Sequence, residues 1–305
     1  MKNTKFGIEI EFTGITRKEA ARVVSEYTGG SVHYENDFYE TYKVTLPDGR
    51  YYKLMRDGSI NTMKKDGNRK VYANDEYSVE LVSPILTYEK DIETLQEIVR
   101  RLRKAGAFVD EDSCGIHIHL NGKDHTVRSI RNFVNIIYSK NDLLYKALQI
   151  KPERFRWCQK MDYSLVETIN RKKPRTFSEL ENIWYTLNPD SRGRCRETHY
   201  HSSRYHFLNL HSFFQGNHTV ELRGFNSTLH AGKIRAYIVL ALALNQQALT
   251  QTKASAKKPQ VENEKFAMRT YLNRIGLIGD EFKNCREHIT AHLEGSAAWR
   301  FGNAA

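Results

Sequence analysis

Residues 5–12, with the sequence Lys-Phe-Gly-Ile-Glu-Ile-Glu-Phe, alternate strictly between apolar and other side chains. Successive side chains of an extended strand point to opposite faces, so the apolar residues share one face and Glu9 and Glu11 share the other. This pattern predicts a strand that packs one face on a core and presents two carboxylates on the other.

The same alternation recurs in four later segments, 77–82, 115–120, 206–213 and 219–225. Each of them is expected to be a strand with one apolar face and one polar face. The polar faces of these strands carry Glu80, then His117 and His119, then Asn209 and His211, and finally Glu221 and Arg223.

Helical segments alternate irregularly with these strands. Thr16 and Glu19 form a capping-box pattern at the start of the first helix, and Gly29-Gly30 ends it. Further helices are expected at about 87–106, 126–149, 178–187 and 231–250. The mixed order predicts an α+β protein with a largely antiparallel, curved sheet. Helices would cover the apolar, outer face, and the polar face would be concave and open to a ligand.

The collected polar face suggests a metal site. Several carboxylates at this density repel one another unless a cation lies between them. Oxygen-rich sites suit Mg²⁺ or Mn²⁺, with imidazole as a minor ligand. One Glu-x-Glu pair alone is usually a solvated strand face, whereas five strands with the same polarity favour a shared site. Magnesium beside arginine is typical of phosphoryl transfer, yet the chain contains neither GxxxxGK[ST] nor GxGxxG, so metal ions and arginines would hold the phosphates.

Composition sets broad limits. The 305 residues carry a net charge of +11, which favours anionic partners or simply solubility. The four cysteines lack CxxC spacing, and this is typical of reduced thiols in a cytoplasmic protein. The N-terminus shows no apolar signal segment, and the longest apolar run, 236–244, is too short to span a bilayer.

Three strand motifs resemble those of known ligases. Residues 114–120, Cys-Gly-Ile-His-Ile-His-Leu, are similar to the Gly-Met-His-Val-His strand of glutamine synthetases, and residues 219–223 resemble their Glu-x-Arg strand. Residues 6–12 resemble the opening strand of the glutamate–cysteine ligase group. In order, together with 56–60, 80–84 and 204–210, the motifs resemble the amidoligase family of the carboxylate–amine ligase superfamily over about residues 5–250.

This resemblance implies a sheet like the glutamine synthetase catalytic domain and an ATP-dependent reaction. ATP would phosphorylate a carboxylate to an acyl phosphate, and an amine would then displace phosphate to give an amide or isopeptide bond. The resemblance implies metal ligands, nucleotide contacts and catalytic residues. The metal ligands would be Glu9, Glu11, Glu80, His117 and Glu221, the nucleotide contacts His117, His119, Asn209 and Arg223, and the catalytic residues Arg223, Arg204 and Asp57, with Ser59 near the substrate.

The Lys-, Ala-, Ser- and Pro-rich segment 251–262 suggests a domain arrangement, and the resemblance implies partners. Residues 1–250 would form the catalytic domain, 251–262 a linker, and 263–305 a helical segment that packs on or extends it. The partners would be a carboxylate-bearing and an amine-bearing substrate, such as peptides or cell-wall precursors, and nucleic acid is not expected. The sequence leaves the particular acid and amine open, together with the oligomeric state.

Two other readings stay open at the sequence level. Carboxylates, histidines and a basic surface also suit a metal-dependent nuclease or phosphodiesterase, and a non-catalytic nucleotide-binding relative would keep the fold. Separately, Cys195, His199 and His201 in a polar loop have spacing that zinc would accept, although a loop that covers the site or reads an acidic substrate is the simpler interpretation.

Overall fold

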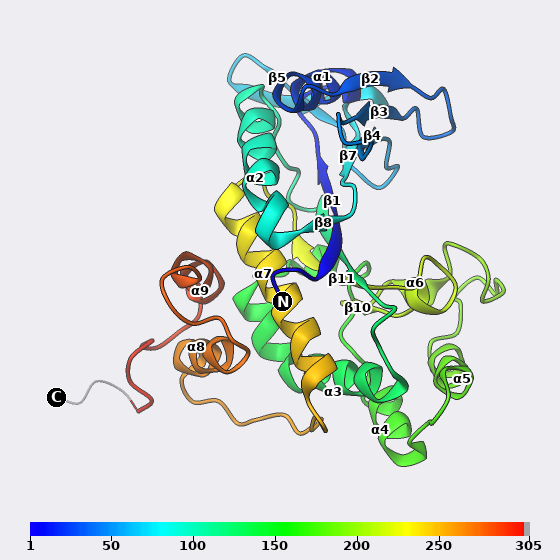
Figure 1. The fold of residues 1–305 in the computed structure, drawn as a ribbon, viewed down its shortest axis with the longest axis vertical. Coiled ribbons are helices and arrows are strands. Elements are labelled where there is room, and N and C mark those ends of the chain that lie inside the picture. The colour runs from blue at the N-terminus through cyan, green and yellow to red at the C-terminus, as the bar shows by residue number, and fades with distance from the viewer. Residues whose placement is uncertain (302–305) are drawn as a thin grey trace. The chain divides into compact units, whose positions relative to one another are not determined.

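The computed structural model describes residues 1–301 and divides into two compact units (Figure 1). Unit 2 comprises Lys2–Ile118 and Phe225–Arg235, and unit 1 comprises the rest of the chain. Strands β9 (Gly115–Asn121) and β11 (Thr219–Asn226) each continue from one unit into the other, as does helix α7 (Ala231–Thr250).

Unit 2 is built on a mostly antiparallel sheet in which hydrogen-bonded neighbours follow the order β9-β1-β7-β4-β3-β2, with β8 also paired to β1. The alternation that predicted a strand at residues 5–12 is confirmed by β1, and the turn after Thr45 joins two strands that pair in register. The strands other than β9 are β1 (Lys5–Phe12), β2 (Ser31–Tyr34), β3 (Tyr42–Thr45), β4 (Tyr51–Met55), β7 (Val79–Val82) and β8 (Leu86–Thr87).

Helices α1 (Arg17–Thr28) and α2 (Tyr88–Lys104) contact each other, and α1 also contacts β3 and β4 (Figure 1). The predicted capping box of α1 is confirmed, because the Thr16 hydroxyl and the Glu19 carboxylate each accept a backbone N–H from the other residue. Gly29 ends the helix with a φ of 68°, a left-handed conformation that glycine adopts without strain. A separate hairpin, β5 (Met63–Asp66) and β6 (Arg69–Tyr72), presents the basic run at 64–70 to solvent.

Unit 1 is mostly helical, with a short antiparallel pair of β10 (Leu208–Asn209) and β11. The apolar run 236–244 is a buried part of α7, as expected. Tyr271 on α8 (Glu264–Arg274) donates a hydrogen bond to Gln247 on α7 at 2.7 Å. The other helices are α3 (Val127–Ala147), α4 (Tyr163–Lys172), α5 (Phe177–Leu187), α6 (His211–Phe214), α8 (Glu264–Arg274) and α9 (Lys283–Thr290).

The described residues thus form an α+β structure with a mostly antiparallel sheet, as predicted. The helices α8 and α9 lie in the segment expected to be helical at 263–305, whose last residues, 302–305, lie outside the described part. Within residues 1–301, no helix is both long and apolar enough to cross a membrane.

One predicted strand was wrong. Residues 206–213 form only the two-residue strand β10, and His211 begins the short helix α6 instead of sharing a strand face with Asn209. The side-chain oxygen of Asn209 accepts the His211 N–H at 2.8 Å, and this local hydrogen bond competes with strand pairing at the point where β10 ends.

Candidate active site

The polar face of the unit 2 sheet begins at β1, where the register of the strands aligns acidic residues. Glu11 pairs with Glu80 across β1 and β7, and Glu80 pairs with Met55 across β7 and β4. Directly paired residues of antiparallel strands point to the same face. The neighbouring residues Ile10 and Leu81 point to the opposite face and are fully buried, so the two sides of the sheet have different polarity.

Glu11 is a buried carboxylate, with 4% of its surface exposed. One of its oxygens accepts the backbone N–H of Gly115 on β9 at 2.5 Å, and its backbone carbonyl accepts the Ser227 hydroxyl. Strand pairing therefore sets its backbone, and the neighbouring strand helps to fix the direction of its side chain.

His117 on β9 lies between two carboxylates. Its Nδ1 atom is 2.8 Å from Glu9 Oε2, and its Nε2 atom is 3.7 Å from Glu11 Oε1. A neutral imidazole that donates its Nδ1–H to Glu9 presents the lone pair of Nε2 on the Glu11 side. That tautomer is the one that a carboxylate-oriented histidine uses to bind a metal.

Glu11, Glu80 and His117 each offer one ligand atom, and these atoms lie within 4.8 Å of one another. We call these three residues the unit 2 cluster. Oxygen ligands lie about 2.1 Å from Mg²⁺, so ligand atoms on opposite sides of the ion are about 4.2 Å apart. Small side-chain movements would bring the cluster to that spacing, and its donor set of two carboxylates and one imidazole fits a hard divalent cation.

Cys114 immediately precedes β9, but its thiol does not add a sulfur ligand to the cluster. Burial, followed by the charge of Glu11, raises the pKa of its thiol to about 12. A thiol that stays protonated is a poor nucleophile and a poor metal ligand. The chemistry of the cluster is therefore that of oxygen and imidazole donors.

Asp57 and Ser59 follow β4 in a tight turn. The Asp57 carboxylate accepts the Ser59 N–H at 2.6 Å, and the Ser78 hydroxyl donates to the Asp57 carbonyl at 2.6 Å. The turn is thereby tied to the segment that leads into β7. Met55, two residues before Asp57, is the residue paired with Glu80.

Unit 1 contains a second polar group, formed by Glu221 and Arg223 on β11 and Asn209 on β10. The Asn209 side-chain amide donates to Glu221 Oε2 at 2.6 Å, and Arg223 Nη1 donates to Glu221 Oε1 at 2.5 Å. All three residues are buried. A guanidinium held by a buried carboxylate is oriented to meet an anion.

The surroundings of Arg223 explain a glycine in the middle of β11. A Cβ atom at Gly224 would lie 1.9 Å from the ring of Phe207, so only glycine allows this ring to pack against the strand. The guanidinium of Arg223 lies 6.0 Å from the Tyr205 ring centre, and its Nε donates to the Trp157 carbonyl at 3.5 Å.

His119, a predicted nucleotide contact, has Nδ1 3.3 Å from the Thr219 hydroxyl.

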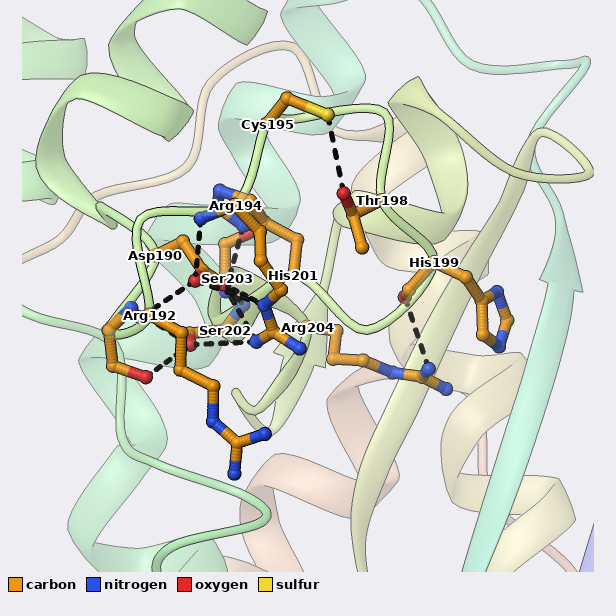
Figure 2. Close-up of polar contacts among 11 residues, drawn as sticks. Asp190, Arg192, Arg194, Cys195, Thr198, His199, His201, Ser202, Ser203 and Arg204 are labelled. Carbon is orange, nitrogen blue, oxygen red and sulfur yellow. Dashed lines mark hydrogen bonds and ion pairs between the residues drawn. The ribbon is translucent and has the colours of Figure 1, made fainter.

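The loop 190–204 in unit 1 is organised by the buried carboxylate of Asp190, shown in Figure 2. Arg194 approaches both of its oxygens, with distances of 3.0 Å from Nε to Oδ1 and 2.8 Å from Nη2 to Oδ2. The Ser202 N–H adds a third contact at 2.7 Å. The Arg194 hydrogen bonds are the largest influence on Asp190 and hold the pKa of its carboxyl below the ordinary value.

Beyond Asp190, the same loop carries the residues considered for zinc. Cys195 is exposed and contacts the Thr198 hydroxyl at 3.3 Å, whereas His201 is buried and contacts Ser203 at 2.9 Å (Figure 2). Within residues 1–301, no group of three ligand atoms within 4.8 Å of one another includes Cys195, His199 or His201. Arg204, a predicted catalytic residue, donates to the His199 carbonyl at 3.2 Å.

His211 also packs against this loop. Its Nδ1 atom lies 2.7 Å from the Tyr185 hydroxyl, and its ring stacks on that of His201 at 5.6 Å. Burial, reinforced by the nearby charges of His201 and Arg204, lowers the pKa of His211 to about 4. His211 is therefore a neutral side chain that packs the loop onto α5 and α6.

An α+β structure with a carboxylate–imidazole cluster on one sheet face suits an enzyme that uses a divalent cation. Residues 2–245 match the family described as "Putative amidoligase enzyme". This match spans most of the chain, which therefore belongs to the amidoligase family. A search of curated proteins found no matching relative.

Proposed function

We propose that this protein is an ATP- and Mg²⁺-dependent carboxylate–amine ligase that forms an amide or isopeptide bond through an acyl phosphate. The observation that carries the proposal is the unit 2 cluster of Glu11, Glu80 and His117 in a chain of the amidoligase family. We further propose that its sheet is of the glutamine synthetase type, because the strands that bear the motifs at 6–12 and 115–120 are sheet neighbours.

The proposed reaction has two balanced steps. A carboxylate oxygen of the acid attacks the γ-phosphorus of ATP, and ADP leaves with the electrons of the broken P–O bond. The amine then attacks the carbonyl carbon of the acyl phosphate, inorganic phosphate leaves, and the amine loses one proton. A bound magnesium ion would supply positive charge to the transferring phosphoryl group.

In unit 2, the chain's own residues would hold the cation and fix its position. Glu11 and Glu80 would supply carboxylate oxygens, and the Gly115 N–H would keep the Glu11 carboxylate from rotating. Glu9 would orient the His117 ring through Nδ1 and leave Nε2 for the cation or a phosphate oxygen. Asp57, at the end of β4, would accept a proton from the attacking amine.

In unit 1, Arg223 would stabilise the negative charge of a phosphate or carboxylate group of a substrate. Its own counter-charge, Glu221, is held in place by Asn209, so the guanidinium meets an incoming anion without first having to find its orientation. Arg204 and His119 would add contacts to the nucleotide or the acid.

The proposal is tested by nucleotide turnover in the purified protein. We would measure ADP and phosphate release with MgCl₂ and pools of carboxylic acids, including acidic peptides, and of amines, and identify amide products by mass spectrometry. We expect release to require the metal, an acid and an amine together, and Glu11→Gln to lower it at least about 100-fold. Glu93→Gln, an exposed site on α2, is the matched control and should retain full activity.

Two outcomes would contradict the proposal. One is metal-dependent cleavage of nucleic acid or a phosphodiester without ATP, which would assign the cluster to hydrolysis. The other is the absence of nucleotide binding and turnover across the pools, together with an unchanged Glu11→Gln variant.

A further inference from the structure

The polar face of the unit 2 sheet carries a second, basic group of side chains beyond the unit 2 cluster. The register places one residue from each of five strands in a single line across the sheet. This line consists of Glu9 on β1, Val82 on β7, Lys53 on β4, Lys43 on β3 and His33 on β2. Because paired residues share a face, Lys53 and Lys43 lie on the same side of the sheet as Glu9.

The alternation along β4 and β3 supports this placement. Tyr52 and Leu54 are fully buried on the opposite face, as is Val44 between Lys43 and Thr45. Lys43 and Lys53 are half-buried on the polar face. They are therefore side chains of the same surface that carries the cluster.

An aromatic side chain gathers the two lysines. The ammonium of Lys43 lies 4.3 Å from the ring centre of Tyr51, and that of Lys53 lies 5.8 Å from it. Tyr51 is two residues before Lys53 on the same face of β4, and 41% of its surface is exposed. Two ammonium groups held beside one ring provide a compact positive surface that an anion can reach.

Nearby carboxylates neutralise this surface only in part. Glu35 lies 3.6 Å from Lys43. Asp37 acts on Lys53 from farther away: its two oxygens accept the Thr41 N–H and hydroxyl, each at 2.9 Å. Burial alone would raise the pKa of Asp37. The hydrogen bonds from Thr41 and the charge of Lys53 outweigh burial and lower this pKa below its ordinary value. Within residues 1–301, Lys53 has no ion pair at 4.0 Å or less.

The spacing of the strands sets the size of a ligand that would reach both groups. Neighbouring strands are about 4.8 Å apart, so Lys53 lies about 10 Å from Glu9 along the line, and Lys43 lies about 14 Å away. An extended peptide advances about 3.4 Å per residue, so three residues span about 10 Å. Within the cluster, Glu80 pairs with Met55 and is about 8 Å from Lys53, whereas Glu11 lies one strand farther away. A ligand that reaches from the middle of the cluster to Lys53 is therefore about three residues long.

We propose that Lys53, Lys43 and Tyr51 form a subsite for a second carboxylate of an acidic peptide substrate, about three residues from the carboxylate that reacts. The placement of the reacting carboxylate at the unit 2 cluster rests on the proposed function. The lysine subsite itself is an equilibrium binding site, and its occupation does not require ATP.

The test uses two blocked tetrapeptides and isothermal titration of the 305-residue protein with MgCl₂ and without nucleotide. One peptide has glutamate at both ends, and the other has glutamine in place of its last glutamate. We expect the doubly acidic peptide to bind about tenfold more tightly, and Lys53→Met to remove that advantage, because a charge-assisted hydrogen bond is lost. Lys43→Met should remove part of it, since Glu35 already neutralises some of its charge.

The double variant Lys18→Met/Lys104→Met is the matched control, because it removes two positive charges from exposed sites on the helices α1 and α2 of unit 2. Circular dichroism would verify that each variant is folded, and Lys53→Arg should keep the preference. The proposal is overturned if the two peptides bind equally, if Lys53→Met keeps the preference, or if the control loses it. It is also overturned if Lys53→Met weakens MgATP binding and leaves peptide binding unchanged.

The two proposals fail separately. If the protein discriminates between the peptides but releases no phosphate from ATP, the lysine subsite is supported and the proposed ligase reaction is refuted. If the protein turns over ATP with an acid and an amine but binds both peptides equally, the ligase reaction is supported and the lysine subsite is refuted.

Discussion

Replacing Glu80 with Gln should change the stability of the protein in opposite directions with and without magnesium. Without a divalent cation, the Glu80 and Glu11 carboxylates repel each other, and the substitution removes one of the two charges. With magnesium present, the same substitution removes a ligand. A solvated strand face would show neither effect, so the pair of signs is specific to a metal site.

The structure gives the scale of both effects. Two unit charges 4.8 Å apart, the upper limit for these ligand atoms, repel each other by about 3.5 kcal/mol at an effective dielectric constant of about 20. Glu80 is half-buried, and solvent, salt and the His117 ring screen this repulsion, so we expect Glu80→Gln to stabilise the metal-free protein by about 1 kcal/mol. At about 100 times its Kd, magnesium should stabilise the wild type by about 2.7 kcal/mol.

The assay is thermal unfolding followed by circular dichroism, in EDTA and in saturating MgCl₂. At about 2.1 cal/mol/K per residue, 305 residues have an unfolding entropy of about 0.64 kcal/mol/K, so the wild-type Tm should rise about 4 °C with magnesium. Glu80→Gln should start about 1–2 °C higher in EDTA and lose most of the rise, whereas Glu93→Gln should behave like the wild type.

The reasoning would be refuted by either of two results. If Glu80→Gln lowered the Tm in EDTA, the carboxylate would be a stabilising polar group rather than one of a repelling pair. If magnesium raised the Tm of the variant as much as that of the wild type, the ion would bind elsewhere.

Three further predictions concern unit 1. Because the pKa of His211 is lowered to about 4, the unfolded state takes up a proton first as the pH falls below about 6.5. Urea unfolding should show a loss of stability between pH 7 and pH 5, and His211→Gln should reduce that loss by about 2 kcal/mol. Asp190→Asn should release the loop 190–204, and trypsin should cleave there at least about tenfold faster than in the wild type under native conditions. Glu221→Gln should lower ATP turnover at least about 100-fold while the fold, judged by circular dichroism, is retained, because Arg223 loses its fixed counter-charge.

Local patterns predicted much of the fold. Strict alternation located β1 and β9, and a capping box with a terminal glycine located α1, because these signals depend only on neighbouring residues. The predicted strand at 206–213 was wrong because a local hydrogen bond outweighed the alternation. Its alternation was that of a strand, but the Asn209 side chain captured the His211 N–H and turned the chain into α6.

The sequence predicted each residue of the candidate site from the pattern of its own strand, but it did not predict which residues lie next to one another. Glu80 joins Glu11 only because β7 pairs with β1 in one particular register, and register depends on contacts between distant segments. The proposed lysine subsite was not predicted from the sequence for the same reason. The alternation of β4 predicts that Lys53 and Tyr51 share a face, but only the β4–β7 and β1–β7 registers align Lys53 with Glu9.

The hydrogen bonds of the carboxylates divide the predicted metal ligands into two kinds. Both oxygens of Glu221 already accept strong hydrogen bonds, one from Asn209 and one from Arg223, so a cation would have to displace an amide or a guanidinium to bind there. In the unit 2 cluster, the ligand atoms of Glu11, Glu80 and His117 lie within 4.8 Å of one another, and a His117 ring that donates its Nδ1–H to Glu9 would present Nε2 to a metal. We therefore expect Glu11→Gln to remove both the magnesium-dependent rise in Tm and ATP turnover, and Glu221→Gln to remove turnover alone. If Glu221→Gln also removed the rise in Tm, Glu221 would be a metal ligand, and Arg223 would have to leave it when magnesium binds.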